Sequence, residues 1–295
     1  MTTSLSIQWQ HSVVDTIHFA GRDYYLKRDD LLTPIAGNKA RKLYGVLQQD
    51  LSAYQQIVSY GGAQSNAMLA LAQLSQQLSL PFHYYSRAVP KWLTQKPLGN
   101  LKQALDCGMH WHISPTGRPP DERPSNSLFI PQGIAMPEAR AGMKRLADEI
   151  EQFCQQQSIK ELAVVIPSGT GATALYLQQY LSHTVYTVPC VGDRHTLQQL
   201  FDQALPNAAR YPIILDTQTR YHFGQPKAEL LAMYQALLQE TGIEFELMYD
   251  AKTWLVLQHW DCPHPIMYLH NGGVSGNVSM LARYRRLAAT QKPNN

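Results

Sequence analysis

A strand that ends in a glycine turn and leads directly into a helix constrains this chain more than any other feature. Residues 163–166 are apolar, as expected of a strand buried on both faces, and a Ser-Gly-Thr-Gly turn follows closely. The same order occurs at residues 57–60, where two glycines precede a helix predicted over residues 66–78. Strands and helices that alternate in this way predict an α/β fold with parallel strands.

The rest of the chain continues this alternation. Residues 138–157 predict an amphipathic helix, because Met143, Leu146, Ile150 and Phe153 recur at spacings of three and four. Residues 115–131 are rich in proline, serine and charged side chains, which predicts an exposed loop. Further strands are predicted over residues 83–86, 184–188, 213–215, 245–248 and 266–269.

Length and charge narrow the class of protein. The 295 residues suffice for two packed α/β lobes. The net charge of +3 comes from dispersed basic residues, so neither nucleic acid nor a membrane surface is expected as a partner. The sequence shows neither a bilayer-spanning apolar stretch nor the pattern of a signal peptide.

The cysteines and histidines argue against a metal site. The four cysteines lie far apart without a Cys-x-x-Cys pair, which also argues against a disulfide framework and favours a cytoplasmic location. The eleven histidines include no His-Glu-x-x-His motif. They are expected to be surface residues or satisfied core residues.

Lys39 stands where a lysine can become reactive. It follows Gly37 and Asn38 at the predicted start of a helix. The potential at a helix N-terminus and burial both lower the pKa of a lysine, and a neutral amine can attack an aldehyde to form a Schiff base. The alternative is an ordinary solvated lysine, which is the usual role of this residue at a helix start.

Gln64, Ser65 and Asn66 follow the two glycines at the start of the predicted helix 66–78. Exposed amides at a helix N-terminus bind anions such as a carboxylate, and these three side chains add donors beside them. The alternative is a helix cap, in which the Ser or Asn side chain satisfies backbone donors without any ligand.

The turn from Ser168 to Thr173 predicts a phosphate site. Its glycines allow a close approach of the backbone, and its hydroxyls add donors. The sequence lacks the Gly-Lys-Ser/Thr of a P-loop and the Gly-x-Ser-x-Gly of a nucleophile elbow. Gly169, Gly171 and Ala174 do match the dinucleotide fingerprint Gly-x-Gly-x-x-Ala, with Asp193 at about the distance of a ribose contact. A plain tight turn is the remaining alternative.

Taken together, these stretches resemble the D-cysteine desulfhydrase and 1-aminocyclopropane-1-carboxylate (ACC) deaminase family of enzymes that use pyridoxal 5′-phosphate (PLP). The matching elements occur in family order over about residues 24–280, nearly the whole chain. They are Tyr25-Leu26-Lys27-Arg28-Asp29-Asp30, Gly37-Asn38-Lys39-Ala40-Arg41-Lys42, Gly62-Ala63-Gln64-Ser65-Asn66, the turn from Ser168 to Thr173, Phe223-Gly224-Gln225-Pro226, Tyr249-Asp250-Ala251-Lys252 and His270-Asn271-Gly272-Gly273.

The resemblance implies a tryptophan synthase β-like fold (fold type II) made of two open α/β lobes. A small domain over residues 46–155 is expected to pack against a large PLP-binding domain made of residues 1–45 and 156–295. The cofactor is expected in the cleft between them, and the family suggests a homodimer.

The resemblance also implies roles for single residues. Lys39 is expected to form the Schiff base and to move the α-proton. Gln64 and Ser65 are expected to hold the substrate carboxylate with Asn66 nearby, Ser65 to assist proton transfer, and Asn66 to bind the phenolic oxygen of PLP. Tyr249 is expected to face the substrate, to stack on it or to act as acid–base or nucleophile. The predicted phosphate cradle comprises Ser168, Gly169, Thr170, Gly171, Ala172 and Thr173.

The chain departs from the family pattern at several of these positions. Phe223 replaces a second active-site tyrosine, with Tyr221 nearby as a possible substitute, and Ala67 replaces a larger polar residue. Asp250 stands where deaminases have Glu and desulfhydrases Thr, and Asn271 where they have Leu and Thr. Either Asp250 or Asn271 is expected to face the pyridine nitrogen, where a carboxylate strengthens the electron sink and an amide weakens it.

The favoured function is β-elimination from a small amino acid, with D-cysteine as the first substrate and a keto acid and ammonia as products. Phe223 and Asp250 favour this over the ring-opening reaction of an ACC deaminase. The altered positions around the ring motivate a PLP-binding protein with little activity as another alternative. The dinucleotide fingerprint leaves a nicotinamide-dependent oxidoreductase as the last.

Overall fold

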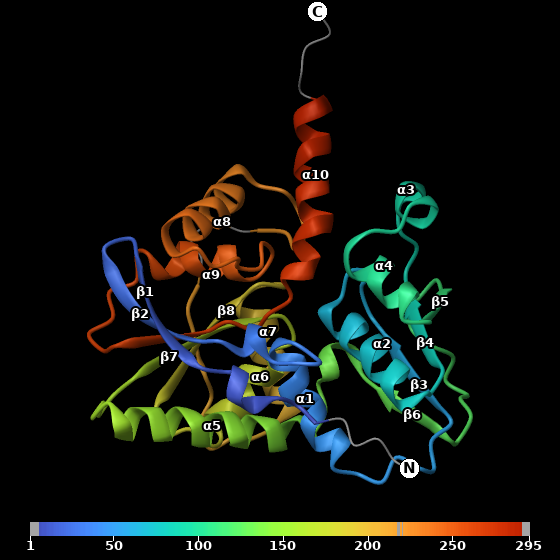
Figure 1. Ribbon diagram of the computed structural model, residues 1–295, viewed down its shortest axis with the longest axis horizontal. Helices are drawn as coiled ribbons and strands as arrows, with labels where there is room; N and C mark the ends of the chain where they lie inside the picture. The colour runs from blue at the N-terminus through green and yellow to red at the C-terminus, as the bar shows by residue number, and fades with distance from the viewer. Residues whose placement is uncertain (1–5, 217–218, 220, 291–295) are drawn as a thin grey trace, which may run out of the picture.

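The computed structural model describes residues 6–216, 219 and 221–290, which form two sheets with helices packed on them (Figure 1). The larger sheet has the order β1-β2-β10-β7-β8-β9, and only β1 and β2 pair antiparallel. Its strands are β1 (Val14–Phe19), β2 (Arg22–Lys27), β7 (Ala163–Ser168), β8 (Thr184–Pro189), β9 (Ile213–Ile214) and β10 (Ile266–Leu269).

Helices cover both faces of the larger sheet because its central strands are apolar on both sides. One face packs against α5 (Ala139–Gln156), α6 (Ala172–Gln178) and α7 (Arg194–Ala204). The other packs against α8 (Ala228–Thr241) and α9 (Asp250–Leu257), where Trp254 is fully buried. The last helix, α10 (Asn277–Thr290), projects away from the sheet in Figure 1.

The smaller sheet is parallel throughout, with the order β5-β4-β3-β6. Its core contains residues of α1 (Gly37–Leu47), α2 (Asn66–Leu78), α3 (Lys91–Gln95) and α4 (Gly99–Asp106). The strands are β3 (Gln56–Tyr60), β4 (Phe82–Ser86), β5 (His110–Ile113) and β6 (Ser127–Ile130).

The smaller sheet lies wholly within residues 46–155, the range predicted for the small domain. Helix α5 ends at this predicted boundary, but its buried face packs into the core of the larger sheet. The domain limits themselves stay a prediction.

Two predictions about single elements are wrong. Residues 245–248 are not a strand, because side chains satisfy their backbone N–H groups. The Asp250 carboxylate accepts from Glu246 N, Asn277 Oδ1 accepts from Leu247 N, and Glu246 Oε2 accepts from Met248 N. The predicted loop 115–131 contains strand β6, and all four residues of this strand pair in parallel with β3.

Candidate active site

A cavity of about 280 Å³ lies where the two sheets meet. It is bordered by the first turns of α1 and α2, the turn after β7, and the segments before α9 and after β10. Of the predicted site residues, this cavity brings together Lys39, Ser65, Asn66, Ser168, Gly169, Thr170, Gly171, Thr173, Tyr249, Asp250 and Asn271. Gln64, Ala172 and Phe223 are not in its lining.

Lys39 lies in the first turn of α1 and lines this cavity. Its Nζ donates to Asn38 Oδ1 at 2.8 Å. Burial of the amine lowers the pKa of Lys39 to about 8, because protein atoms around it replace the water that would solvate its charge. The amine is therefore partly neutral near neutral pH, as a Schiff-base lysine requires.

The helix that carries Lys39 is anchored by a buried ionic network. Arg41 donates to both carboxylate oxygens of Asp29, at 2.5 and 2.6 Å, and its Nη2 reaches Glu149 of α5 at 2.8 Å. Lys27 of β2 lies 3.0 Å from the same Glu149 carboxylate. This network joins α1 to the larger sheet and fixes the start of the helix.

The turn after β7 brings backbone close to the cavity. Gly171 has φ +76°, and a Cβ there would lie 2.5 Å from Phe201 Cε1. Gly169 faces the Tyr249 ring, 3.3 Å from where its own Cβ would stand. Gly171 therefore requires glycine, and the cavity side of the turn stays open to a ligand.

The hydroxyl groups of the turn already have protein partners. Ser168 Oγ lies 2.6 Å from Thr187 Oγ1, and Thr173 Oγ1 accepts from Asn38 Nδ2 at 3.3 Å. A serine or threonine oxygen can still take part in a second hydrogen bond. These contacts therefore fix the side chains and leave them able to bind a ligand.

The Gln64–Asn66 stretch divides between structural and site roles. Ser65 caps α2, since its Oγ accepts from Ala67 N and Met68 N. The Gln64 amide donates to Leu98 O at 2.9 Å and accepts from Asn100 N at 3.0 Å, which directs it toward α4. Asn66 lines the cavity, with its Oδ1 accepting from Asn100 Nδ2.

Tyr249 lines the cavity from the position just before α9. Burial, reinforced by the Glu246 carboxyl, raises its pKa well above the ordinary value, so its hydroxyl stays protonated. Phe223 packs edge-on against its ring with 5.2 Å between centroids. Tyr221, the possible substitute for the missing hydroxyl, borders a different and smaller pocket beside Lys252.

Asp250 and Asn271 differ in how their oxygens are used. Asp250 accepts from Tyr268 Oη at 2.6 Å and from Glu246 N at 2.8 Å. Burial raises its pKa. Asn271 Oδ1 is also buried, but it has no hydrogen-bond partner within the described part of the chain. A buried acceptor without a partner is costly, and a ligand in the cavity would satisfy it.

The cavity also contains residues that were not predicted, among them Lys42, Gln132 and Gly133. Lys42 lies one helical turn after Lys39 and donates to Gly133 O at 2.9 Å, and Gln132 and Gly133 complete that wall. The three-residue spacing on one helix face is the signal that could have revealed Lys42. Nothing in the sequence around Gln132 marks it as part of a site.

Asp193, the residue in the ribose position of the dinucleotide fingerprint, caps α7. Its Oδ1 accepts from Thr196 N at 2.9 Å and from Thr196 Oγ1 at 2.8 Å. This contact gives Asp193 a structural role as a helix cap.

Comparison with known proteins gives relatives over most of the chain. D-cysteine desulfhydrase of Serratia proteamaculans (strain 568) is 27% identical over 293 residues, which cover 86% of this chain and 88% of that protein. An ACC deaminase of Pseudomonas syringae pv. tomato is 23% identical and covers 87% of this chain and 88% of its own. No protein-family model matches the chain.

Solved structures of known enzymes share the fold of this chain. An ACC deaminase homologue superimposes with a TM-score of 0.75 at 20% identity and covers 93% of both chains. A threonine deaminase from T.th. does so with a TM-score of 0.61 at 15% identity, covering 89% of this chain and 92% of its own. The predicted fold type II and the predicted resemblance are therefore confirmed.

Proposed function

We propose that this chain, a PLP-dependent enzyme of the lyase and deaminase kind, eliminates the β-substituent of a small amino acid, with D-cysteine as the first substrate to test. Its relatives bear out the predicted enzyme class and cofactor. The observation that carries the proposal is a lysine with a lowered pKa in a cavity that also contains a glycine turn and an unpartnered buried acceptor.

The residues present fit PLP. The turn from Ser168 to Thr173 would hold the phosphate, since Gly171 cannot accept a side chain and leaves the backbone exposed to the cavity. Asn66 would bind the phenolic oxygen. Asn271 is a better partner than Asp250 for the ring nitrogen, because its Oδ1 has no other partner among the described residues. Bound PLP supplies an electron sink for the pair released when the α-proton leaves.

Each side chain around the cofactor has a separate role in the proposed reaction. Lys39 Nζ takes the proton from the substrate Cα. The N-terminal end of α2, at Ser65 and Asn66, holds the substrate carboxylate. Ser65 Oγ accepts from two backbone N–H groups of α2, and its hydroxyl also forms a hydrogen bond with the Tyr84 hydroxyl, so Ser65 is proposed to assist proton transfer together with Tyr84. Tyr249 keeps its hydroxyl proton and presents it as a donor toward the departing group.

In this proposal Gln64 is a positioning residue. Both ends of its amide are bound to the segment at the start of α4, so it orients the loop before α2.

A homodimer in the cytoplasm also remains part of this proposal. Of the helices in the described residues, none is long and apolar enough to cross a membrane.

The test is the visible spectrum of the purified protein before and after borohydride, followed by a digest. A yellow protein with a pyridoxyl adduct on the Lys39 peptide, together with pyruvate release from D-cysteine, supports the proposal. Lys39→Ala should abolish both, whereas Lys160→Ala, at an exposed lysine outside the cavity lining, should retain them. Full turnover by Lys39→Ala overturns the mechanism.

Two alternatives predict other results. An ACC deaminase consumes ACC faster than D-cysteine, and Phe223 in place of a tyrosine argues against that outcome. A PLP-binding protein with little activity gives the same adduct but no turnover of any D- or L-amino acid in a broad panel.

A further inference from the structure

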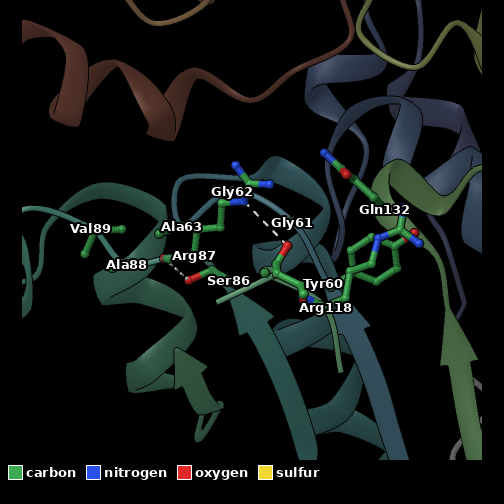
Figure 2. Close-up of a pocket in the computed structure, with 12 residues that line it drawn as sticks. Tyr60, Gly61, Gly62, Ala63, Ser86, Arg87, Ala88, Val89, Arg118 and Gln132 are labelled. Carbon is green, nitrogen blue, oxygen red and sulfur yellow. Dashed lines mark hydrogen bonds between the residues drawn. The ribbon is translucent and has the colours of Figure 1, made fainter. Parts of the chain in front are cut away.

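A second cavity, of about 450 Å³, opens over the carboxyl ends of the smaller sheet (Figure 2). The loops after β3, β4 and β5 border it, and so does Gln132, just after β6. The chain runs from β3 to β4 to β5 on one side, whereas β6 pairs on the other side of β3. The cavity therefore lies at a topological switch point, where open α/β sheets bind ligands.

The charged residues that line this cavity are both cationic. They are Arg87 and Arg118, and within the described residues no acidic side chain joins them. The Arg118 guanidinium lies over the Tyr60 ring, 4.9 Å from its centroid. Gly117 packs against the stem of Arg87, since a Cβ there would stand 2.9 Å from Arg87 Cγ. Arg87 Nε also lies 3.5 Å from Thr116 O. Both arginines are exposed, and among the described residues their terminal guanidinium nitrogens have no hydrogen-bond partner, so these donors remain free.

The backbone adds donors between them. Within the described part of the chain, the N–H groups of Gly62 and Ala63 make no hydrogen bond. A Cβ on Gly62 would point into open space, so the loop does not close over itself. Guanidinium groups and free backbone N–H groups at one cavity are the donors that recognise a carboxylate or another oxyanion.

This cavity borders the candidate active site. Gln132 lines both, and its Cγ lies 3.3 Å from the Cβ position of Gly61. The side chain of cysteine is one methylene with a thiol and would leave the second cavity empty. A volume of 450 Å³ is within the range of about 300–1,000 Å³ that small-molecule sites occupy.

We infer that this cavity receives the anionic end of a longer leaving group, so that the preferred substrates are cysteine thioethers whose sulfur substituent carries a carboxylate. This rests on the proposed β-elimination. With S-carboxymethylcysteine, the Cβ–S bond breaks and its electron pair leaves on sulfur, while the Cα proton passes to Lys39 Nζ. Hydrolysis of the released enamine balances the reaction: substrate and water give mercaptoacetate, pyruvate and ammonia.

The experiment compares S-carboxymethylcysteine with S-carbamoylmethylcysteine, which has the same shape without the charge. Both enantiomers of each are assayed with the holoenzyme, and D-cysteine serves as the reference substrate. The variants are Arg87→Gln and Arg118→Gln. Lys91→Gln removes one positive charge at an exposed position outside the cavity lining and is the matched control.

The expected kcat/KM for the acid exceeds that for the amide by about 10-fold at low salt, as a charge-assisted hydrogen bond provides. Either arginine variant should reduce this ratio toward one, and Lys91→Gln should not. Equal kcat/KM for acid and amide in the unmodified enzyme overturns the inference. So does a ratio that survives both arginine substitutions.

Calorimetry separates this inference from the proposed function. Mercaptoacetate and mercaptoacetamide are titrated into the holoenzyme and the same variants, a measurement that needs no turnover. Tighter binding of mercaptoacetate that requires both arginines supports the pocket even if D-cysteine is not consumed. Consumption of D-cysteine together with equal binding of the two probes supports the proposed function and refutes the inference that the second cavity binds an anionic leaving group.

Discussion

Arg41 and Asp29 form an ion pair that the protein encloses completely. Their side chains are 0% and 1% exposed, and Arg41 Nε lies 2.5 Å from Asp29 Oδ2. The neighbouring Arg41 cation holds the pKa of Asp29 below its ordinary value despite burial. Because Arg41 is on the same helix turn as Lys39, this pair connects the stability of the fold to the position of the Lys39 amine.

Asp29→Ala should lower the free energy of unfolding by about 3 kcal/mol, because it leaves a buried guanidinium with only Glu149 as a counter-charge. Urea denaturation measures this. Asp148→Ala breaks an exposed pair with Lys144 on α5 and is the control, with an expected loss of less than about 0.5 kcal/mol. Equal losses in the two variants would show that the buried pair does not stabilise the fold.

The pKa of Lys39 predicts how the apoprotein takes up PLP. The amine is mostly charged below pH 8 and mostly neutral above it, so the rate of covalent attachment should rise as the pH increases through about 8 and then level off. Stopped-flow absorbance between pH 6.5 and 9.5 measures this. A rate that rises steadily to pH 9.5 would mean that the cavity does not lower the pKa.

Gly171→Ala should weaken PLP binding by at least about 10-fold and lower stability by about 2–3 kcal/mol. The substitution combines a positive φ with a clash against Phe201 and Leu197. Gly21→Ala is the matched control, since Gly21 has φ +78° and nothing within 4 Å of its Cβ position. Its expected loss is about 1 kcal/mol, with PLP affinity retained.

Glu246 makes stability depend on pH. Burial and the Asp250 carboxylate raise the pKa of Glu246 to about 8, so the folded protein holds a proton that the unfolded chain releases at about 4.5. Its contribution is full below pH 4.5 and is lost as the pH rises through 8. Glu246→Gln keeps an acceptor for Tyr249 N and should flatten the fall in the urea midpoint between pH 5.5 and 8.5. An unchanged slope would assign that fall to Asp250, whose pKa is also raised.

Sequence reasoning worked best where local chemistry determines the structure. The helix predicted over 66–78 matches α2, because Ser65 gives a cap and the apolar spacing is regular. The motifs around Lys39, Ser168 and Asn271 predicted residues that meet in one cavity although they are far apart in the chain. Those motifs are readable because each requires an unusual residue combination.

The remaining features depend on tertiary contacts. Residues 245–248 have the apolar character of a strand, but Glu246 and Asn277 take the backbone N–H groups that a strand would offer to a neighbour. The second cavity and Gln132 have no local signature, because Arg87 and Arg118 come together only when β4 and β5 pair. The role of Gln64 likewise depends on α4, about 35 residues away along the chain.

Asn271 and Gly37 interlock more closely than any side chain at position 37 would allow, since a Cβ there would stand 1.6 Å from the Asn271 carbonyl oxygen. The N–H of Asn38 donates to that same oxygen. Lys39 is thus positioned by a segment that the ribosome makes more than 200 residues later. During synthesis the smaller sheet can form early, but a nascent chain cannot complete the site until its last quarter has emerged.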